Sequence, residues 1–143
     1  MAKSDTLRMA QMALAESDGG LARAAWKLDH RQALDAWGDE AGRVVALMGH
    51  ELALPASGLV FRAQAPHEPL GWSWTLDERV ALGFMSIGGL FSRTPGASML
   101  LLRRELRAGD GLASFAWESE VLVSPSWDGV ERVELGPFGQ VAM

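Results

Sequence analysis

The stretch LMGHELALP, residues 47–55, separates two parts of the chain that have different sequence patterns. Before it, apolar side chains recur every three or four residues, which is the period of one face of an α-helix. After it, short apolar runs alternate with residues typical of turns, which indicates strands joined by loops. Pro55 cannot continue a helix, because it lacks a backbone N–H donor. The stretch therefore predicts an α+β fold, with N-terminal helices, one of them long, packed on a C-terminal antiparallel β-sheet.

Two helices are predicted before this boundary. Residues 4–16 are mostly good helix formers, and Asp18 is a suitable N-cap for a long second helix that runs to about Leu54. The second helix has an apolar stripe that predicts a buried face, made of Trp26, His30, Ala33, Trp37, Ala41, Val44, Met48 and Leu52.

Three glycines, Gly38, Gly42 and Gly49, lie within this second helix. Each is about 1 kcal/mol less favourable than alanine in a helix interior, so a compensating reason is expected. One reason is a strip of small residues that lets another helix approach closely. The other is a break near Gly38, which would give three N-terminal helices, and the two alternatives carry nearly equal weight.

Residues 58–143 are predicted to form mainly antiparallel sheet, with a first strand at 58–63 and a loop at 64–69. Residues 70–91 fit either a helix that begins at the capping-box sequence Thr75-Leu76-Asp77-Glu78 or two strands, and the helix is slightly favoured. Asp110-Gly111 predicts a tight hairpin turn between strands at 98–107 and 112–123. That register places Arg104 opposite Trp117, and a third strand is predicted at 130–135.

The composition is that of one globular domain of 143 residues, with a helical part at 1–54 and a sheet part at 58–143. The net charge is −5, and the only basic cluster, Arg103, Arg104 and Arg107, is interleaved with leucines and Glu105. Because nucleic-acid binding needs a concentrated positive surface, we expect no nucleic-acid partner. No apolar run approaches the ~18 residues of a membrane span, and the N-terminal apolar run is too short for a signal sequence, so we expect a cytoplasmic, acidic protein.

The sequence His50-Glu51-Leu52-Ala53-Leu54 is one residue short of the zinc motif H-E-x-x-H, because a leucine stands where the second histidine would be. A zinc site would need His67 to approach His50 together with Glu51 or Glu68, and nothing in the spacing requires this. A histidine in the last turn of a helix is explained by the negative end of the helix dipole. We therefore predict no catalytic residue, no metal and no cofactor.

The sequence contains six tryptophans and no tyrosine. Trp72, Trp74 and Trp127 stand beside Gly, Ser and Pro in segments expected at the surface, and exposed tryptophan is enriched at binding hot spots. Met9 and Met12 would add adaptable apolar contacts on the first helix. With the three helix glycines, these residues predict a non-enzymatic interaction or assembly subunit that binds a protein partner or a second copy of itself. We expect such a subunit to form a homo-oligomer, or to act as an accessory or chaperone-like component of a larger complex such as a virion or secretion machine.

The alternative hypothesis is a small α+β enzyme or ligand carrier, in which the sheet curls around an apolar pocket. Tryptophan and phenylalanine side chains would line that pocket, with Phe61 and Trp117 among them. His50 or His67 would supply its polar group.

Overall fold

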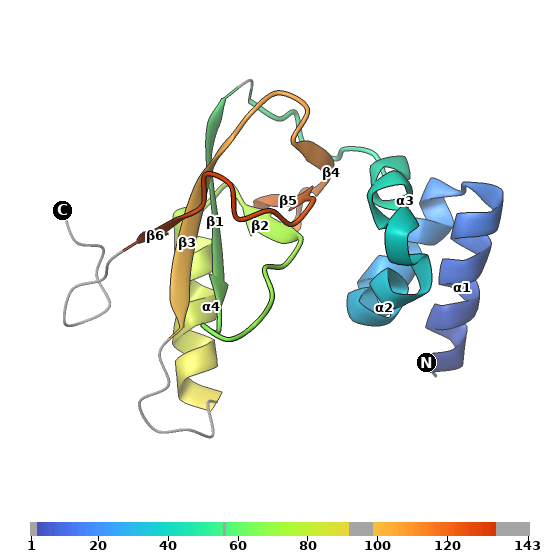
Figure 1. Cartoon of the computed structure of the whole chain (residues 1–143), viewed down its shortest axis with the longest axis horizontal. Coiled ribbons are helices and arrows are strands. Elements are labelled where there is room, and N and C mark those ends of the chain that lie inside the picture. The colour runs from blue at the N-terminus through green and yellow to red at the C-terminus, as the bar shows by residue number, and fades with distance from the viewer. Residues whose placement is uncertain (1–2, 56, 92–98, 134–143) are drawn as a thin grey trace. The chain divides into compact units, whose positions relative to one another are not determined.

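The computed structural model describes residues 3–55, 57–91 and 99–133 (Figure 1). The predicted α+β fold is confirmed, since the N-terminal part is helical and the C-terminal part contains a six-stranded antiparallel sheet. The chain divides into two compact units, Met1–Ala53 with Leu112–Ser114, and Leu54–Gly111 with Phe115–Met143. No helix in the described ranges combines the length and the apolar character needed to cross a lipid bilayer. A single domain stays a prediction.

The helical unit contains α1 (Lys3–Glu16), α2 (Gly19–Trp37), a short 3-10 turn η1 (Gly38–Glu40) and α3 (Ala41–Leu47). Its helices α1 and α2 pack closely because the facing positions are alanines that are fully buried, Ala10, Ala13, Ala22, Ala25 and Ala33. The indole Nε1 of Trp37 donates a hydrogen bond to the carbonyl of Ala10 over 2.9 Å. The predicted apolar stripe is therefore confirmed at its centre, although His30 is exposed.

The long helix α2 begins where Asp18 was predicted to cap it, since Asp18 Oδ1 accepts the N–H of Leu21 over 3.1 Å. The helix is kinked at Asp29, whose φ of −160° and ψ of 92° are not helical. The Asp29 carboxylate accepts the N–H of Gln32 over 3.2 Å, so it caps the second half of the helix as an N-cap would.

Of the two alternatives for the glycines, the structure has the break, because Gly38 adopts a φ of 53° and ends α2. The predicted helix end near Leu54 is wrong. Helix α3 stops at Leu47, and Gly49 takes a φ of 76°, a left-handed conformation in which glycine commonly ends helices.

The close backbone approach that the glycines suggested occurs at Gly19 instead. A Cβ atom built on Gly19 would lie 2.8 Å from the carbonyl carbon of Leu47 and closer still to its oxygen. A Cβ atom built on Gly38 or Gly42 would meet no described atom of this chain within 4 Å. Their contact with a second copy stays a prediction.

The sheet unit is built around β1 (Gly58–Gln64) and β3 (Leu100–Leu106), which pair over their full lengths. The other strands are β2 (Ser73–Thr75), β4 (Gly111–Phe115), β5 (Glu120–Val123) and β6 (Glu131–Val133), and the strand order is β4-β5-β2-β1-β3-β6. One face of the sheet holds a core of Val60, Leu70, Trp74, Leu102, Leu106, Val121 and Val123. The first predicted strand and the loop after it are confirmed.

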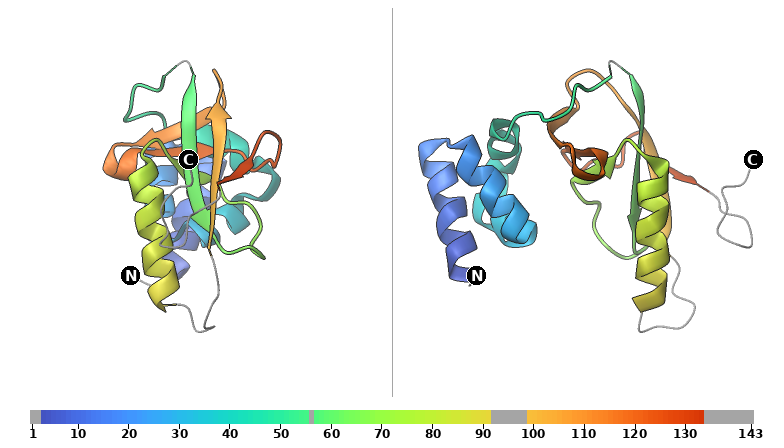
Figure 2. Two further views of the ribbon diagram at one scale, coloured as in Figure 1. Left: turned by 90° about the vertical axis from the view of Figure 1, so that its left-hand side faces the viewer. Right: turned by 180° about the vertical axis from the view of Figure 1, so that it is seen from behind.

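The ambiguous segment 70–91 contains β2 followed by a helix, α4 (Glu78–Phe91), so the favoured alternative is confirmed from Glu78 onward. The cap differs from the prediction: Asp77 Oδ1 accepts the N–H of Arg79 over 2.9 Å, whereas Thr75 belongs to β2. Helix α4 lies along β1 and β3 on the opposite face of the sheet, where Ala81 packs with Phe61 and Leu101 (Figure 2).

The predicted hairpin is wrong, although its strand segments largely exist. Strand β3 pairs with β1 and β6, and β4 lies at the far edge of the sheet beside β5. The turn forms earlier than Asp110-Gly111, because Asp110 N donates to the carbonyl of Arg107 over 3.1 Å and Gly109 takes the positive φ of 89°. The chain therefore leaves β3 without folding back on it. Residues 98, 134 and 135, the outer ends of two predicted strands, lie outside the described residues.

Candidate functional site

His50 ties the end of the helical segment to β4. Its Nδ1 lies 3.0 Å from the hydroxyl of Ser114, and that hydroxyl also accepts the N–H of Leu52 over 3.1 Å. Backbone hydrogen bonds flank this contact, from Glu51 N to the carbonyl of Ser114 and from Ser114 N to the carbonyl of Gly49. Because Ser114 is fully buried, its hydroxyl cannot meet a substrate. The serine and histidine therefore hold the structure together rather than forming a nucleophilic pair.

The ligands considered for zinc are otherwise engaged or exposed. Glu51 lies 3.5 Å from the guanidinium of Arg23, and His67 is exposed in the loop after β1. Within the ranges that the structure describes, no three His, Asp or Glu side chains are grouped in a way that could hold a metal ion.

The candidate interaction residues lie in different environments. Trp74 is only 2% exposed and belongs to the sheet core, so it cannot contact a partner from there. Trp72 is half-buried, whereas Trp127 and Met12 are exposed, and Met9 is partly exposed.

The apolar pocket of the alternative hypothesis is not assembled from its candidates. Phe61 is buried between the sheet and α4, and Trp117 lies at the surface. The expected contact of Arg104 with Trp117 depended on the hairpin register, which the structure does not have.

Within the described residues, Trp117 is the most exposed large apolar side chain, at 80%. It lies in a corner between β4 and β5, where the next two residues, Glu118 and Ser119, have φ values of 59° and 49°. Three hydrogen bonds fix this corner. Thr75 Oγ1 donates to the carbonyl of Glu118 over 2.7 Å, the N–H of Leu76 donates to the carbonyl of Ser119, and the N–H of Ser119 donates to the carbonyl of Ala116. We call residues 116–119 the Trp117 corner.

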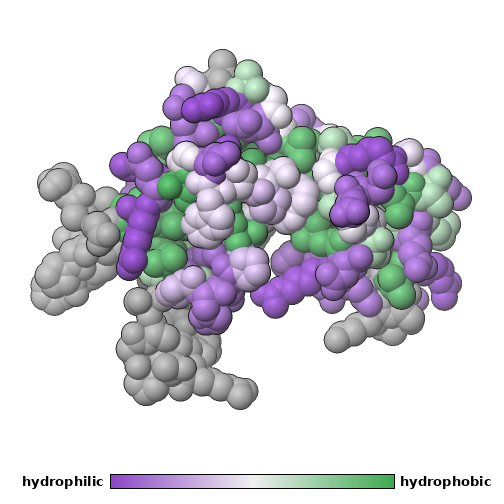
Figure 3. All heavy atoms as spheres, in the orientation of Figure 1, coloured by the Kyte–Doolittle hydropathy of each residue, from purple (hydrophilic) through white to green (hydrophobic). Residues whose placement is uncertain are grey.

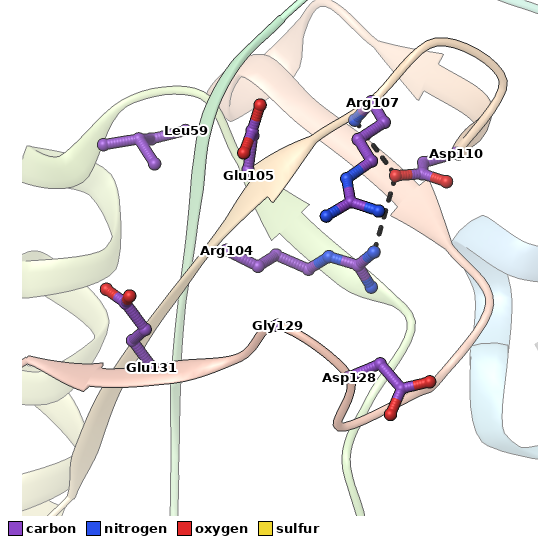
Figure 4. A pocket seen from close by; sticks show the side chains of 8 residues that line it. All are labelled: Leu59, Arg104, Glu105, Arg107, Asp110, Asp128, Gly129 and Glu131. Carbon is purple, nitrogen blue, oxygen red and sulfur yellow. Dashed lines mark hydrogen bonds and ion pairs between the residues drawn. The ribbon is translucent and has the colours of Figure 1, made fainter.

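A second feature is a cavity of about 410 Å³ in the sheet unit, beside the end of β3 (Figure 4). It is lined by Leu59, Arg104, Glu105, Arg107, Asp110, Asp128, Gly129 and Glu131. Asp110 holds the two arginines in place: its Oδ2 accepts the N–H of Arg107 over 3.0 Å and lies 3.5 Å from Arg104 Nη2. We call this the Arg104 cavity.

Sequence reasoning missed both features. The exposure of Trp117 could not be foreseen, because a continuous strand at 112–123 was predicted across the corner and neither Glu118 nor Ser119 signals a positive φ. The basic cluster Arg103, Arg104 and Arg107 was a signal for the cavity, but it was interpreted only as a possible nucleic-acid-binding surface.

Comparison of this chain with protein-family models, with curated proteins and with solved structures gave no significant match.

Proposed function

We propose that this protein is a non-enzymatic interaction subunit that binds another protein through the Trp117 corner. The observation that carries the proposal is an 80% exposed tryptophan on a backbone that is strained and yet fixed by hydrogen bonds. Tryptophan is among the residues most enriched at interface hot spots. A tryptophan at a fixed position loses little conformational freedom when a partner covers it, which favours binding.

The strain of the corner supports the same conclusion. Residues other than glycine in the left-handed region are destabilised by roughly 1–3 kcal/mol each, and they persist only where the surrounding structure enforces them. Two such residues in succession, Glu118 and Ser119, directly follow the tryptophan. Strain of this kind clusters at functional positions, and here it directs the chain so that Trp117 projects outward.

The character of the remaining surface favours a local contact. On the face drawn in Figure 3, the coloured hydrophobic side chains lie in small groups between hydrophilic ones. Other exposed apolar side chains of the described residues, such as Leu28 at 42% and Phe84 at 47%, are less exposed than Trp117. An exposed tryptophan that acts as an anchor can supply much of the binding energy of a specific interface.

The test begins with the second copy of the chain as the partner. Light scattering coupled to size exclusion would measure the mass of the purified protein over a range of concentrations, against 15.4 kDa for the monomer. If the chain self-associates, Trp117→Ala should weaken the association by about 2 kcal/mol or more, as is usual for a hot spot. Trp127→Ala removes another exposed tryptophan and tests the earlier prediction that Trp127 belongs to the interface; binding through the Trp117 corner predicts that this variant associates as the natural chain does.

A monomer would direct the search to a different protein. A photo-crosslinking side chain placed at residue 118 would then identify what covers the corner, and capture should be lost in Trp117→Ala but kept in Trp127→Ala. Equal capture by both variants would refute the proposal.

A further inference from the structure

The Arg104 cavity contains two guanidinium groups, those of Arg104 and Arg107, and the carboxylate that contacts both of these residues is that of Asp110. Arg104 lies on β3 opposite Val60, between the core residues Leu102 and Leu106, and its side chain is only 12% exposed. A charge removed from water in this way needs a close partner of opposite sign. Among the described side chains its ion-pair partner is Asp110, 3.5 Å away, at the outer limit of a hydrogen bond.

Other donors of the two arginines have no hydrogen-bond or ion-pair partner within the part of the chain that the structure describes. Among the described residues, the buried Nε of Arg104 has no hydrogen-bond partner. The guanidinium of Arg107 makes no ion pair with any described side chain, because Asp110 accepts its backbone N–H rather than its side chain. In Figure 4 this guanidinium points toward that of Arg104, so the two positive groups face the same space.

The other carboxylates of the lining are placed elsewhere. Glu131 is paired with Arg103 over 3.0 Å. Figure 4 shows the carboxylates of Glu105 and Asp128 directed away from the two guanidinium groups. The space between Arg104 and Arg107 can therefore accept one further negatively charged group.

The chemistry of that group is restricted by the rest of the wall. Two arginines and four carboxylates give the lining a formal charge of −2, which disfavours a phosphate or any other multiply charged anion. A carboxylate matches the forked donors of arginine, and an ammonium group on the same ligand would be attracted by the surrounding acids. The volume of about 410 Å³ lies in the usual range for small-molecule sites.

We propose that the Arg104 cavity binds a small zwitterion of the α-amino-acid class, with the ligand carboxylate between Arg104 and Arg107. The acidic side chains around it interact with the ligand ammonium. This site is separate from the Trp117 corner, and its occupancy does not depend on the protein-binding role proposed above.

The experiment is an NMR titration of the ¹⁵N-labelled full chain with L-alanine, L-alaninamide, acetate and inorganic phosphate. L-alanine should shift the amide signals of Arg104, Arg107 and Gly129 with a Kd on the order of 1 mM, as suits a ligand with so few atoms. Alaninamide lacks the carboxylate and should not shift them, acetate lacks the ammonium and should bind more weakly, and phosphate should bind more weakly than L-alanine.

Arg107→Gln is the decisive variant, because this exposed side chain carries no described contact that the fold needs. It should weaken L-alanine binding about tenfold or more, as expected for the loss of a hydrogen bond to a charged group. Arg79→Gln makes the same charge change on α4, outside the cavity, and should leave the affinity unchanged. The proposal fails if these amide signals have not shifted when L-alanine reaches about 50 mM, a large excess over the expected Kd. It also fails if alaninamide or phosphate binds as tightly as L-alanine, or if Arg107→Gln binds as the natural chain does.

Discussion

Replacement of Gly19 by alanine should destabilise the helical unit, although the same change usually stabilises a helix. The new Cβ would lie 2.8 Å from the carbonyl carbon of Leu47, whereas non-bonded carbon atoms rest at about 3.5–4.0 Å. The beginning of α2 and the end of α3 would have to separate by about 1 Å to accommodate it. Forcing extra atoms into a packed site is destabilising by about 1–3 kcal/mol, and the gain in helix propensity offsets at most about 1 kcal/mol of this.

The matched control is Gly42→Ala in α3, where the added Cβ meets no atom within 4 Å. This variant should be more stable than the natural chain by about 0.5–1 kcal/mol. Urea unfolding followed by circular dichroism at 222 nm measures both variants, and the midpoint of Gly19→Ala should fall while that of Gly42→Ala rises. If Gly19→Ala is as stable as Gly42→Ala, the close approach of the two helix ends does not exist in solution.

Three further substitutions test other parts of the structure. Ser114→Ala leaves the partly buried N–H of Leu52 without its acceptor, so unfolding should require about 1–3 kcal/mol less and the Leu52 amide should exchange faster with solvent; unchanged exchange would contradict the contact. Glu118→Gly relieves a φ of 59° and should raise the thermal midpoint, by up to about 1 kcal/mol in stability, whereas a lower midpoint would argue against the strained corner. Hydrogen bonds from Arg79 lower the pKa of Asp77 below its ordinary value of 3.8. The ionised carboxylate therefore stabilises the fold fully at pH values above that ordinary pKa, and this stabilisation is lost as the pH falls through the pKa of the folded state. Urea midpoints of Asp77→Asn and the natural chain should therefore converge between about pH 5 and pH 2, and a constant difference would exclude this linkage.

Local patterns predicted most helices and several strands because the signals for these elements lie within a few residues. Asp18 caps α2 through a hydrogen bond to a residue three positions ahead, and the apolar stripe of α2 follows from the helix period alone. The kink at Asp29 was missed, although aspartate is a preferred N-cap residue, because the apolar spacing continues across it.

Strand pairing could not be predicted from neighbouring residues. Asp110-Gly111 satisfied the local rule for a hairpin, yet β3 pairs with β1, a strand about forty residues earlier in the chain. That pairing places Val60 beside Leu102 and Leu106 in the core, a gain in buried apolar surface that no turn signal encodes. The Arg104 cavity depends on the same pairing, since Arg104 lies on β3 opposite Val60.

The contact between His50 and Ser114 also affects whether the edge of the sheet can pair with a strand of another molecule. The two outermost strands of an open sheet carry backbone donors and acceptors that can recruit further strands and cause aggregation. Residues 49–52 cover β4 at one margin, and the described part of β6 at the other margin, Glu131–Val133, carries the charged residues Glu131 and Arg132. A covered strand and a strand with charged side chains both resist the addition of another strand. If copies of this chain associate, they should therefore do so through side chains, and the assemblies should stay finite instead of growing into fibres.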